Sequence, residues 1–197
     1  MYFYDETHAK KGADDVTSML YDFFTTKVPE NIKTLHLFCD GCGGQNKNWT
    51  MFRFLHYMVH KEQRFESIKL CFPVRGHSYL ECDADMAHVP QSTRTEVPSD
   101  WEKAISLCRR NPLPYNVIKL PQADYKSFTE FLSQDYRKTS PMCSRPIREM
   151  KFEKDQPRFL MYRCTWSGCY LSADVFPKRR QKNRENVRSE EHTSELQ

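Results

Sequence analysis

The sequence predicts an α/β protein, because segments with strand and helix periodicity alternate over its first half. Two short apolar runs, at residues 34–39 and 67–72, have the length and composition of buried strands. Before and between them, residues 12–26 and 45–60 repeat apolar side chains every three or four positions, the period of an amphipathic helix. This alternation favours parallel strand pairing, because each helix returns the chain across the sheet.

The first half of the chain contains six predicted elements. Aromatic residues favour strand structure at the start, and Pro90 ends the last helical segment. In chain order the elements are a strand at residues 1–4, a helix at 12–26, a strand at 34–39, a helix at 45–60, a strand at 67–72 and a helix at 79–88.

The second half predicts a smaller α+β extension. The capping box Ser99-Asp100-Trp101-Glu102 begins a helix at residues 99–110. The remaining predicted elements are a strand at 115–120, a helix at 124–136, and strands at 147–152, 158–162 and 170–176. We place a soft boundary at residues 91–98, which divides a core at residues 1–92 from an extension at 99–176.

Composition excludes several classes of protein. With 197 residues, 39% of them hydrophobic, the chain can bury a substantial core. No segment approaches the ~18 consecutive apolar residues that a membrane span needs. Acidic Asp5 and Glu6 stand where a signal peptide would be apolar. We therefore expect a nuclear or cytoplasmic protein that is neither secreted nor bound to a membrane.

The C-terminal end predicts a basic, disordered tail at residues 177–197. Its cluster Pro177-Lys178-Arg179-Arg180-Gln181-Lys182 is typical of nucleic-acid binding or nuclear import, and also of a merely solvated tail. The last ten residues, 188–197, match an in-frame translation of a sequencing adapter, so we exclude them from the fold.

The eight cysteines leave two interpretations open. Cys39 and Cys42 have the C-x-x-C spacing of half a zinc site, but the pair Cys164 and Cys169 fits the second half poorly. A thiol within an apolar strand is more often a small buried hydrophobic side chain. A cysteine nucleophile at Cys42 would need a partner histidine, and no histidine lies at a spacing from Cys42 that indicates a catalytic Cys–His pair.

Asp40 is the first candidate for catalysis, because it follows the predicted strand at residues 34–39. In open α/β sheets, binding and catalytic sites form at the carboxyl ends of the strands. The loop after the strand at 67–72 would bring His77 to the same edge of the sheet as Asp40. Asp83 or Asp85, on the next helix, would supply a second carboxylate. Such oxygen ligands suit Mg²⁺ or Mn²⁺ in phosphodiester cleavage. Each residue also has a plain alternative role, in a turn, at a helix N-terminus or as a buried histidine.

The segment after Asp40 predicts contacts with nucleic acid. Gly43 and Gly44 would let a phosphate approach the backbone, and a helix beginning at Gln45 would offer it unpaired N–H groups. Polar and basic side chains of this edge could bind sugar, phosphate or bases, and we predict this role for Gln45, Asn46, Lys47, Asn48 and Arg75.

Three blocks of the sequence resemble a known family. YDETHAKKGADDVTSML, FCDGCGGQNKN and FPVRGHSYLECDADMAHV are similar to RNase-H-like domains of unknown function in transposon-derived proteins of animals. The resemblance is strong over residues 2–90 and weak to about residue 175. It implies DDE/D-type nuclease or transposase chemistry, in which acids bind two Mg²⁺ or Mn²⁺ ions. Asp40 matches the acid after the fourth strand, Asp83 the acid of the last helix, His77 the histidine of its block and Glu6 an acid of the first block.

The resemblance also implies a three-layer fold, with helices on both faces of a mixed sheet in the order 3-2-1-4-5. Because residues 1–4 resemble the third strand, we expect the first two strands and one acid to be missing. They would lie between the strand at 1–4 and the strand at 34–39. An incomplete fold of this kind would be marginally stable and catalytically inactive on its own.

Two functional hypotheses follow. The first is a transposon-derived nuclease or transposase domain that acts on nucleic acid, most simply DNA, in its intact form. The alternative is a domesticated module that binds nucleic acid without catalysis, whose affinity falls steeply with salt and does not depend on metal.

Overall fold

The structure is a computed structural model that describes residues 1–5, 9–74, 80–89, 95–111 and 113–177. Its centre is one five-stranded mixed sheet, which confirms the α/β fold class. The strands are β1 (Thr34–Phe38), β2 (Ser67–Cys71), β3 (Glu149–Glu153), β4 (Phe159–Arg163) and β5 (Leu171–Asp174).

The strands lie in sequence order across the sheet, with β1 at one edge and β5 at the other. β1 and β2 are parallel, as the helix between them requires, whereas each of the next three pairings is antiparallel. The strands of the second half therefore extend the sheet of the first half, because β3 pairs along the whole length of β2.

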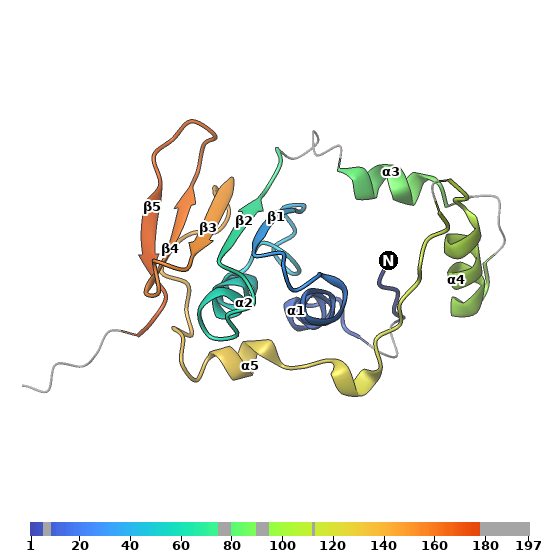
Figure 1. Ribbon diagram of the computed structural model, residues 1–197, viewed down its shortest axis with the longest axis horizontal. Helices are drawn as coiled ribbons and strands as arrows, with labels where there is room; N and C mark the ends of the chain where they lie inside the picture. Colours follow the sequence, from blue (N-terminus) through green and yellow to red (C-terminus); the bar gives the residue numbers. More distant parts are fainter. Residues whose placement is uncertain (6–8, 75–79, 90–94, 112, 178–197) are drawn as a thin grey trace, which may run out of the picture.

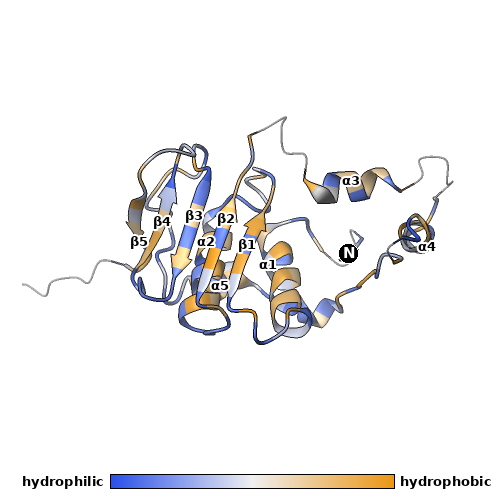
Figure 2. Ribbon diagram, turned by 45° about the horizontal axis from the view of Figure 1, so that its top comes forward, coloured by the Kyte–Doolittle hydropathy of each residue, from blue (hydrophilic) through white to orange (hydrophobic). Residues whose placement is uncertain are grey.

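Three helices cover one face of this sheet (Figures 1 and 2). They are α1 (Ala13–Asp22), which continues as a short π-helix at Phe23–Lys27, α2 (Trp49–His60) and α5 (Phe128–Leu132). Among the described elements, we find no helix over the opposite face, so the predicted three-layer arrangement is not seen in this part of the chain.

The largest core lies between this sheet and these helices. Nine of the twelve residues of α2 are buried, because the sheet packs on one side of it and α1 and α5 on the other. Aromatic rings dominate the contacts: Phe54 lies 5.0 Å from Phe128 and 6.2 Å from Phe24, between ring centroids. Burial of such rings is a main source of folding free energy.

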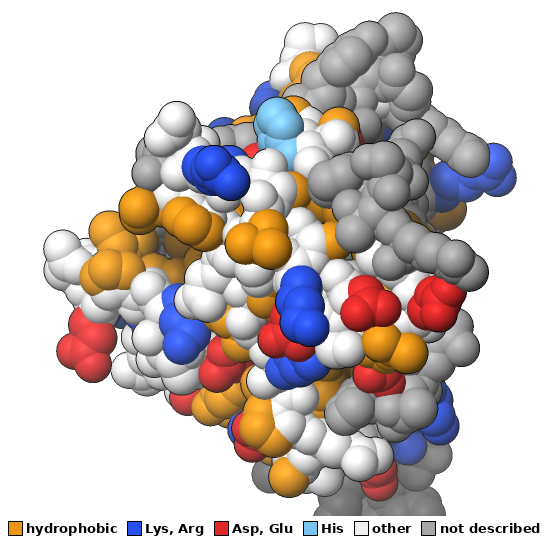
Figure 3. Space-filling view, turned by 90° about the vertical axis from the view of Figure 1, so that its right-hand side faces the viewer, with side chains coloured by type: hydrophobic (Ala, Val, Ile, Leu, Met, Phe, Trp, Pro, Cys, Tyr) orange, Lys and Arg blue, Asp and Glu red, His pale blue; other side chains and the backbone are white. Residues whose placement is uncertain are grey.

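The segment between β2 and α5 forms an arm beside the sheet (Figure 1). It carries α3 (Glu81–Ala87), α4 (Pro98–Leu107) and a 3-10 turn at Gln122–Asp124. Val89, Ala104, Ile105 and Tyr115 form a second, smaller core there. Figure 3 views the molecule from this end, where hydrophobic side chains lie among acidic and basic ones.

Four predicted elements are corrected by the structure. The segments at residues 1–4 and 115–120, both predicted as strands, pair with each other only through an isolated bridge between Tyr2 and Ile118. Neither segment is a strand of the sheet. The helix predicted at 124–136 is reduced to α5, because the Lys126 N–H donates to the Ser18 hydroxyl at 2.9 Å and is held out of a helix. The helix predicted from residue 45 begins at Trp49.

A histidine is buried within the core at the C-terminal end of α2. His56 has no exposed surface, its Nδ1 lies 3.0 Å from the Tyr136 hydroxyl, and its ring stacks on His60 at 4.1 Å between centroids. Burial lowers the pKa of His56 from 6.5 to about 3, and the neighbouring His60 and Lys61 contribute in the same direction. His56 is therefore neutral in the folded protein near pH 7.

The aromatic core predicts a large effect of Phe54→Ala. Removing this fully buried ring leaves a cavity between α1, α2 and α5, and should lower the free energy of unfolding by about 3–5 kcal/mol in urea titrations. Phe131→Ala is the matched control, because that ring is 48% exposed, and it should cost less than about 1.5 kcal/mol. Equal effects of the two substitutions would contradict the packing described.

Burial of His56 predicts acid sensitivity. The unfolded chain takes up a proton below pH 6.5 that the folded protein takes up only near pH 3. Stability should therefore be complete above pH 6.5 and fall as the pH falls, by up to about 1.4 kcal/mol per pH unit. His56→Gln should flatten the dependence of the unfolding free energy on pH over this window. His36→Gln, at an exposed position on β1, should leave it unchanged.

Candidate functional site

The candidate site is the loop at residues 39–48, which joins the carboxyl end of β1 to α2. Cys39 keeps the chain on the sheet, because its N–H donates to the Cys71 carbonyl at 3.1 Å. The Cys42 carbonyl then accepts the N–H groups of Gln45, Asn46 and Lys47 at 2.9–3.3 Å, which closes a tight turn. This turn is why α2 begins four residues later than its periodicity predicts.

Asn48 ends the loop as the N-cap of α2. Its side-chain oxygen accepts the N–H of Met51 at 2.9 Å, which satisfies one of the otherwise unpaired donors of the first helical turn. The predicted helix N-terminus at Gln45 is therefore wrong, and Asn48 has a structural role in addition to any contact with a ligand.

Asp40 lies at the mouth of this loop and is exposed. Its Oδ1 accepts hydrogen bonds from the Asn46 side-chain amide at 2.7 Å and the Cys42 N–H at 3.3 Å. Its Oδ2 accepts no hydrogen bond from a described residue. Asp40 thus closes the turn with one oxygen and presents the other outward, at the edge of the sheet where the sequence predicts it.

Gly43 and Gly44 expose bare backbone beside Asp40. A Cβ atom added to either glycine would meet no atom within 4 Å, and neither residue has a positive φ. Crowding and backbone strain, the two usual structural reasons for glycine, are therefore both absent here. The N–H groups of the two glycines also donate to no described residue.

Cationic residues come from the loop itself and from the segment at residues 145–148, which contacts it. Lys47 is buried, and its ammonium group donates to the Arg145 carbonyl at 3.0 Å and lies 4.7 Å from the centre of the Phe72 ring. Burial lowers the pKa of Lys47, and the positive charge of Arg148 lowers it further. The side chain of Arg145 is exposed and that of Arg148 is partly exposed. Segment 145–148 therefore brings two more cations to the loop, and the sequence alone did not reveal them.

The structure places the other predicted acid elsewhere. Asp83 lies in the first turn of α3, where its carboxylate accepts the Leu80 N–H at 3.1 Å. Figure 1 shows α3 on the arm with α4, whereas Asp40 follows β1 in the sheet. Asp85 pairs with Arg109 at 3.6 Å and accepts a hydrogen bond from Tyr115, so it links α3 to the rest of the arm.

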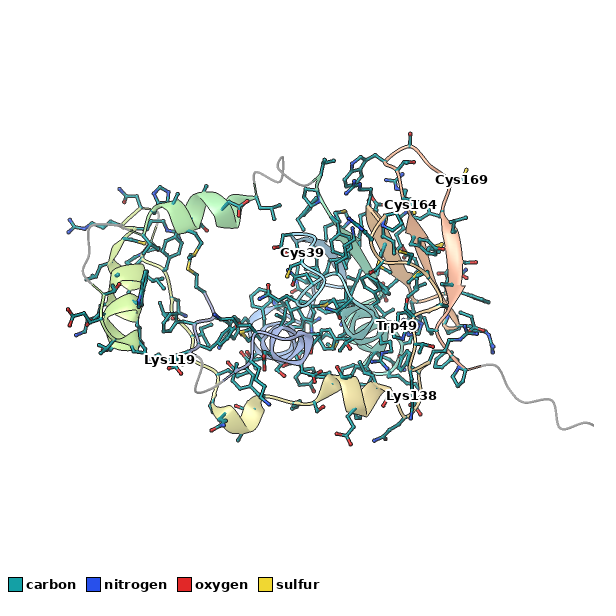
Figure 4. All side chains as sticks on the ribbon, turned by 180° about the vertical axis from the view of Figure 1, so that it is seen from behind. Cys39, Trp49, Lys119, Lys138, Cys164 and Cys169 are labelled. Carbon is teal, nitrogen blue, oxygen red and sulfur yellow. The ribbon has the colours of Figure 1, made fainter. Side chains whose placement is uncertain are left out.

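Three predicted residues, Glu6, Arg75 and His77, lie outside the described residues. Within the described ranges, no group of three or more His, Cys, Asp or Glu side chains could hold a metal ion. Among the described residues, the loop therefore has no set of three such ligands for Mg²⁺ or Mn²⁺, and no third ligand for a zinc ion at Cys39 and Cys42. Figure 4 shows Cys39 on a different segment from Cys164 and Cys169, which both lie in the connection between β4 and β5.

A buried charge cluster beside the loop escaped the sequence analysis. Glu149 is 2% exposed, and its carboxylate accepts hydrogen bonds from Arg163, at 2.8 Å, and from the Tyr170 hydroxyl, with Lys69 at 3.8 Å. Burial raises the pKa of Glu149, but the bonds from Tyr170 and Arg163 outweigh it and hold the pKa below the ordinary value. No local pattern could have shown this cluster, because it depends on the register of three strands.

The fold and the loop define a two-layer α/β domain with a glycine-bearing loop at an edge strand. The chain matches the family described as Domain of unknown function (DUF7869) over residues 1–155, and it belongs to that family. Searches among curated proteins and among solved structures found no match. No helix of the described residues is long and apolar enough to cross a membrane.

The capping geometry predicts that Asn48→Ala removes the N-cap of α2. The substitution should lower the free energy of unfolding by about 1 kcal/mol, because the Met51 N–H loses its acceptor. Asn48→Asp preserves an acceptor oxygen and should retain most of the stability. If both variants were as stable as the native chain in urea titrations, α2 would not depend on this cap.

Proposed function

We propose that this chain binds nucleic acid through the loop at residues 39–48, with the phosphate backbone against Gly43 and Gly44. The observation that carries the proposal is the bare backbone of these glycines. A glycine that is needed neither for its φ nor for space within the chain is suited to the close approach of a ligand. Backbone N–H groups and nearby cations are standard partners of phosphate oxygens.

The charges around the loop support the same partner. Lys47 of the loop and the segment that carries Arg145 and Arg148 meet where the Lys47 ammonium group donates to the Arg145 carbonyl, and Asp40 is the acid of the loop itself. The Asp40 carboxylate is held in the turn by two neutral donors, the Asn46 amide and the Cys42 N–H. A polyanion gains from such a site by releasing its counterions, so binding should weaken steeply with salt.

Metal-dependent cleavage, the DDE/D-type chemistry that the sequence resemblance implies, does not follow from the geometry of the loop. The described residues do not bring Asp40 and Asp83 together with a third ligand, so no step through Mg²⁺ or Mn²⁺ is assigned. We therefore propose the binding function alone for this chain, and we expect EDTA to leave its affinity for DNA unchanged.

If a phosphate lies against Gly43 and Gly44, substituting both glycines should weaken DNA binding without lowering the stability of the fold. The double variant Gly43→Ala/Gly44→Ala should weaken binding of a fluorescein-labelled 20-nucleotide DNA at least tenfold in fluorescence anisotropy, because two methyl groups would stand where the phosphate lies. Its free energy of unfolding should be unchanged or higher by about 0.4–1 kcal/mol per residue, since alanine restricts the unfolded chain.

Gly12→Ala serves as the control, because an added Cβ there also has room and the residue lies at the start of α1. It should bind the DNA as the native chain does. Native affinity in the double loop variant would show that the two glycines do not contact the ligand.

A further inference from the structure

The face of the sheet opposite the helices carries an unbalanced positive charge. Alternation along the strands places Leu35, Leu70 and Phe152 toward the helices, and their neighbours point to the other face. Figure 2 shows no described helix over that other face. No described helix therefore covers this face, although Cys71 and Glu149 on it are buried among neighbouring side chains.

One row across this face sets two lysines directly opposite each other. In register, His36 lies beside Lys69, Lys69 beside Lys151, and Lys151 beside Met161. Like charges directly opposite on neighbouring strands destabilise a sheet. An anion bound over the row would relieve this repulsion.

The acids of the face do not balance this charge. Glu149, in the next row, already accepts hydrogen bonds from Arg163 and Tyr170, and its distance to Lys69 is 3.8 Å. Arg163 still has a buried Nε–H without an acceptor among the described residues. Lys151 lies against the Tyr170 ring, 4.4 Å from its centre, rather than against a carboxylate. Glu153 and Asp174 also lie on this face, and Asp174 pairs with Arg158 at 2.8 Å, so four cations face three acids.

An aromatic ring completes the surface. Phe38 is 60% exposed at the end of β1, in the same row as Cys71, Glu149 and Arg163. An exposed ring on a strand is costly in water and is a platform for a nucleic-acid base, whose stacking tolerates any sequence. With strands ~4.8 Å apart, the row from β1 to β4 spans about 14 Å, enough for a short stretch of single strand.

We propose that this open sheet face binds single-stranded nucleic acid, with phosphates along Lys69, Lys151 and Arg163 and a base stacked on Phe38. The proposal rests on the nucleic-acid function of the neighbouring loop and extends it, because the loop begins directly after β1. It names the form of the substrate, since the bases of a duplex are stacked on each other and cannot reach Phe38.

The experiment measures binding of the full chain to a fluorescein-labelled 20-nucleotide single-stranded DNA and to its duplex, by anisotropy at 50–200 mM NaCl. Lys69→Gln/Lys151→Gln should weaken single-strand binding about tenfold at 100 mM and reduce the slope of log Kd against log salt by about 1.4, or about 0.7 for each lost phosphate contact. Because Lys69 also pairs with buried Glu149, Lys151→Gln is measured alone as well: it leaves that pair intact, should not lower the melting temperature, and should reduce the salt slope by about 0.7.

Phe38→Ala should weaken single-strand binding about tenfold without changing the salt slope, and should leave duplex binding unchanged. Lys27→Gln/Lys138→Gln is the matched control for charge. Both lysines are exposed, and Lys138 lies beside α5, away from the open face (Figure 4). This control should bind as the native chain does.

The outcomes separate this proposal from that of the loop. If the face variants bind as the native chain does while the Gly43→Ala/Gly44→Ala variant loses affinity, the sheet-face proposal is overturned and the loop proposal stands. If the face variants lose affinity and the loop variant does not, the loop proposal fails and the face proposal stands. Tighter binding of the duplex, or equal competition by polyglutamate with no effect of Phe38→Ala, would overturn the single-strand assignment.

Discussion

The burial of α2 is the constraint on which the rest of this structure depends. Because one side of α2 packs on β2 and β3 and the other on α1 and α5, a single helix connects both halves of the chain into one core. Its buried polar residues have to find partners inside that core, as His56 Nδ1 does with Tyr136 and Arg53 with the Arg137 carbonyl, although His56 Nε2 and Arg53 Nε have no partner among the described residues. Its N-terminus, in turn, fixes where the loop at residues 39–48 must end.

Glu149 has a comparable part at the opposite face of the sheet. Its carboxylate joins β2, β4 and the residue before β5, so the charges of this face are organised around one buried acid. Removing one partner of a buried carboxylate that accepts several hydrogen bonds is strongly destabilising, because the donor or acceptor left behind stays unpaired. The same arrangement leaves Lys69 and Lys151 insufficiently neutralised, which connects the stability of the sheet to its proposed affinity for a polyanion.

The loop and the open face together change the view of function that the sequence suggests. The resemblance to RNase-H-like domains directs attention to Asp40 and Asp83 as metal ligands, but the structure gives them different local roles. Asp40 closes a turn and Asp83 caps a helix. Both roles are common for acids that follow a strand or begin a helix. The bare glycines, the opposed lysines and the exposed ring of Phe38 have no evident packing role among the described residues, and all three suit the proposed binding of a nucleic acid.

The sequence by itself determined the α/β class, the strands at β1 to β5 and the helices α1 to α4 within a few residues, because each has a local periodicity or a local cap. It also placed Asp40 at a strand end and Gly43 and Gly44 in the following loop. Only the tertiary structure decided the order of the sheet, the length of α5, the inward turn of Lys47 and the cluster around Glu149. These depend on contacts between residues far apart in the chain, such as Lys126 with Ser18 and Glu149 with Arg163, and no local pattern encodes them.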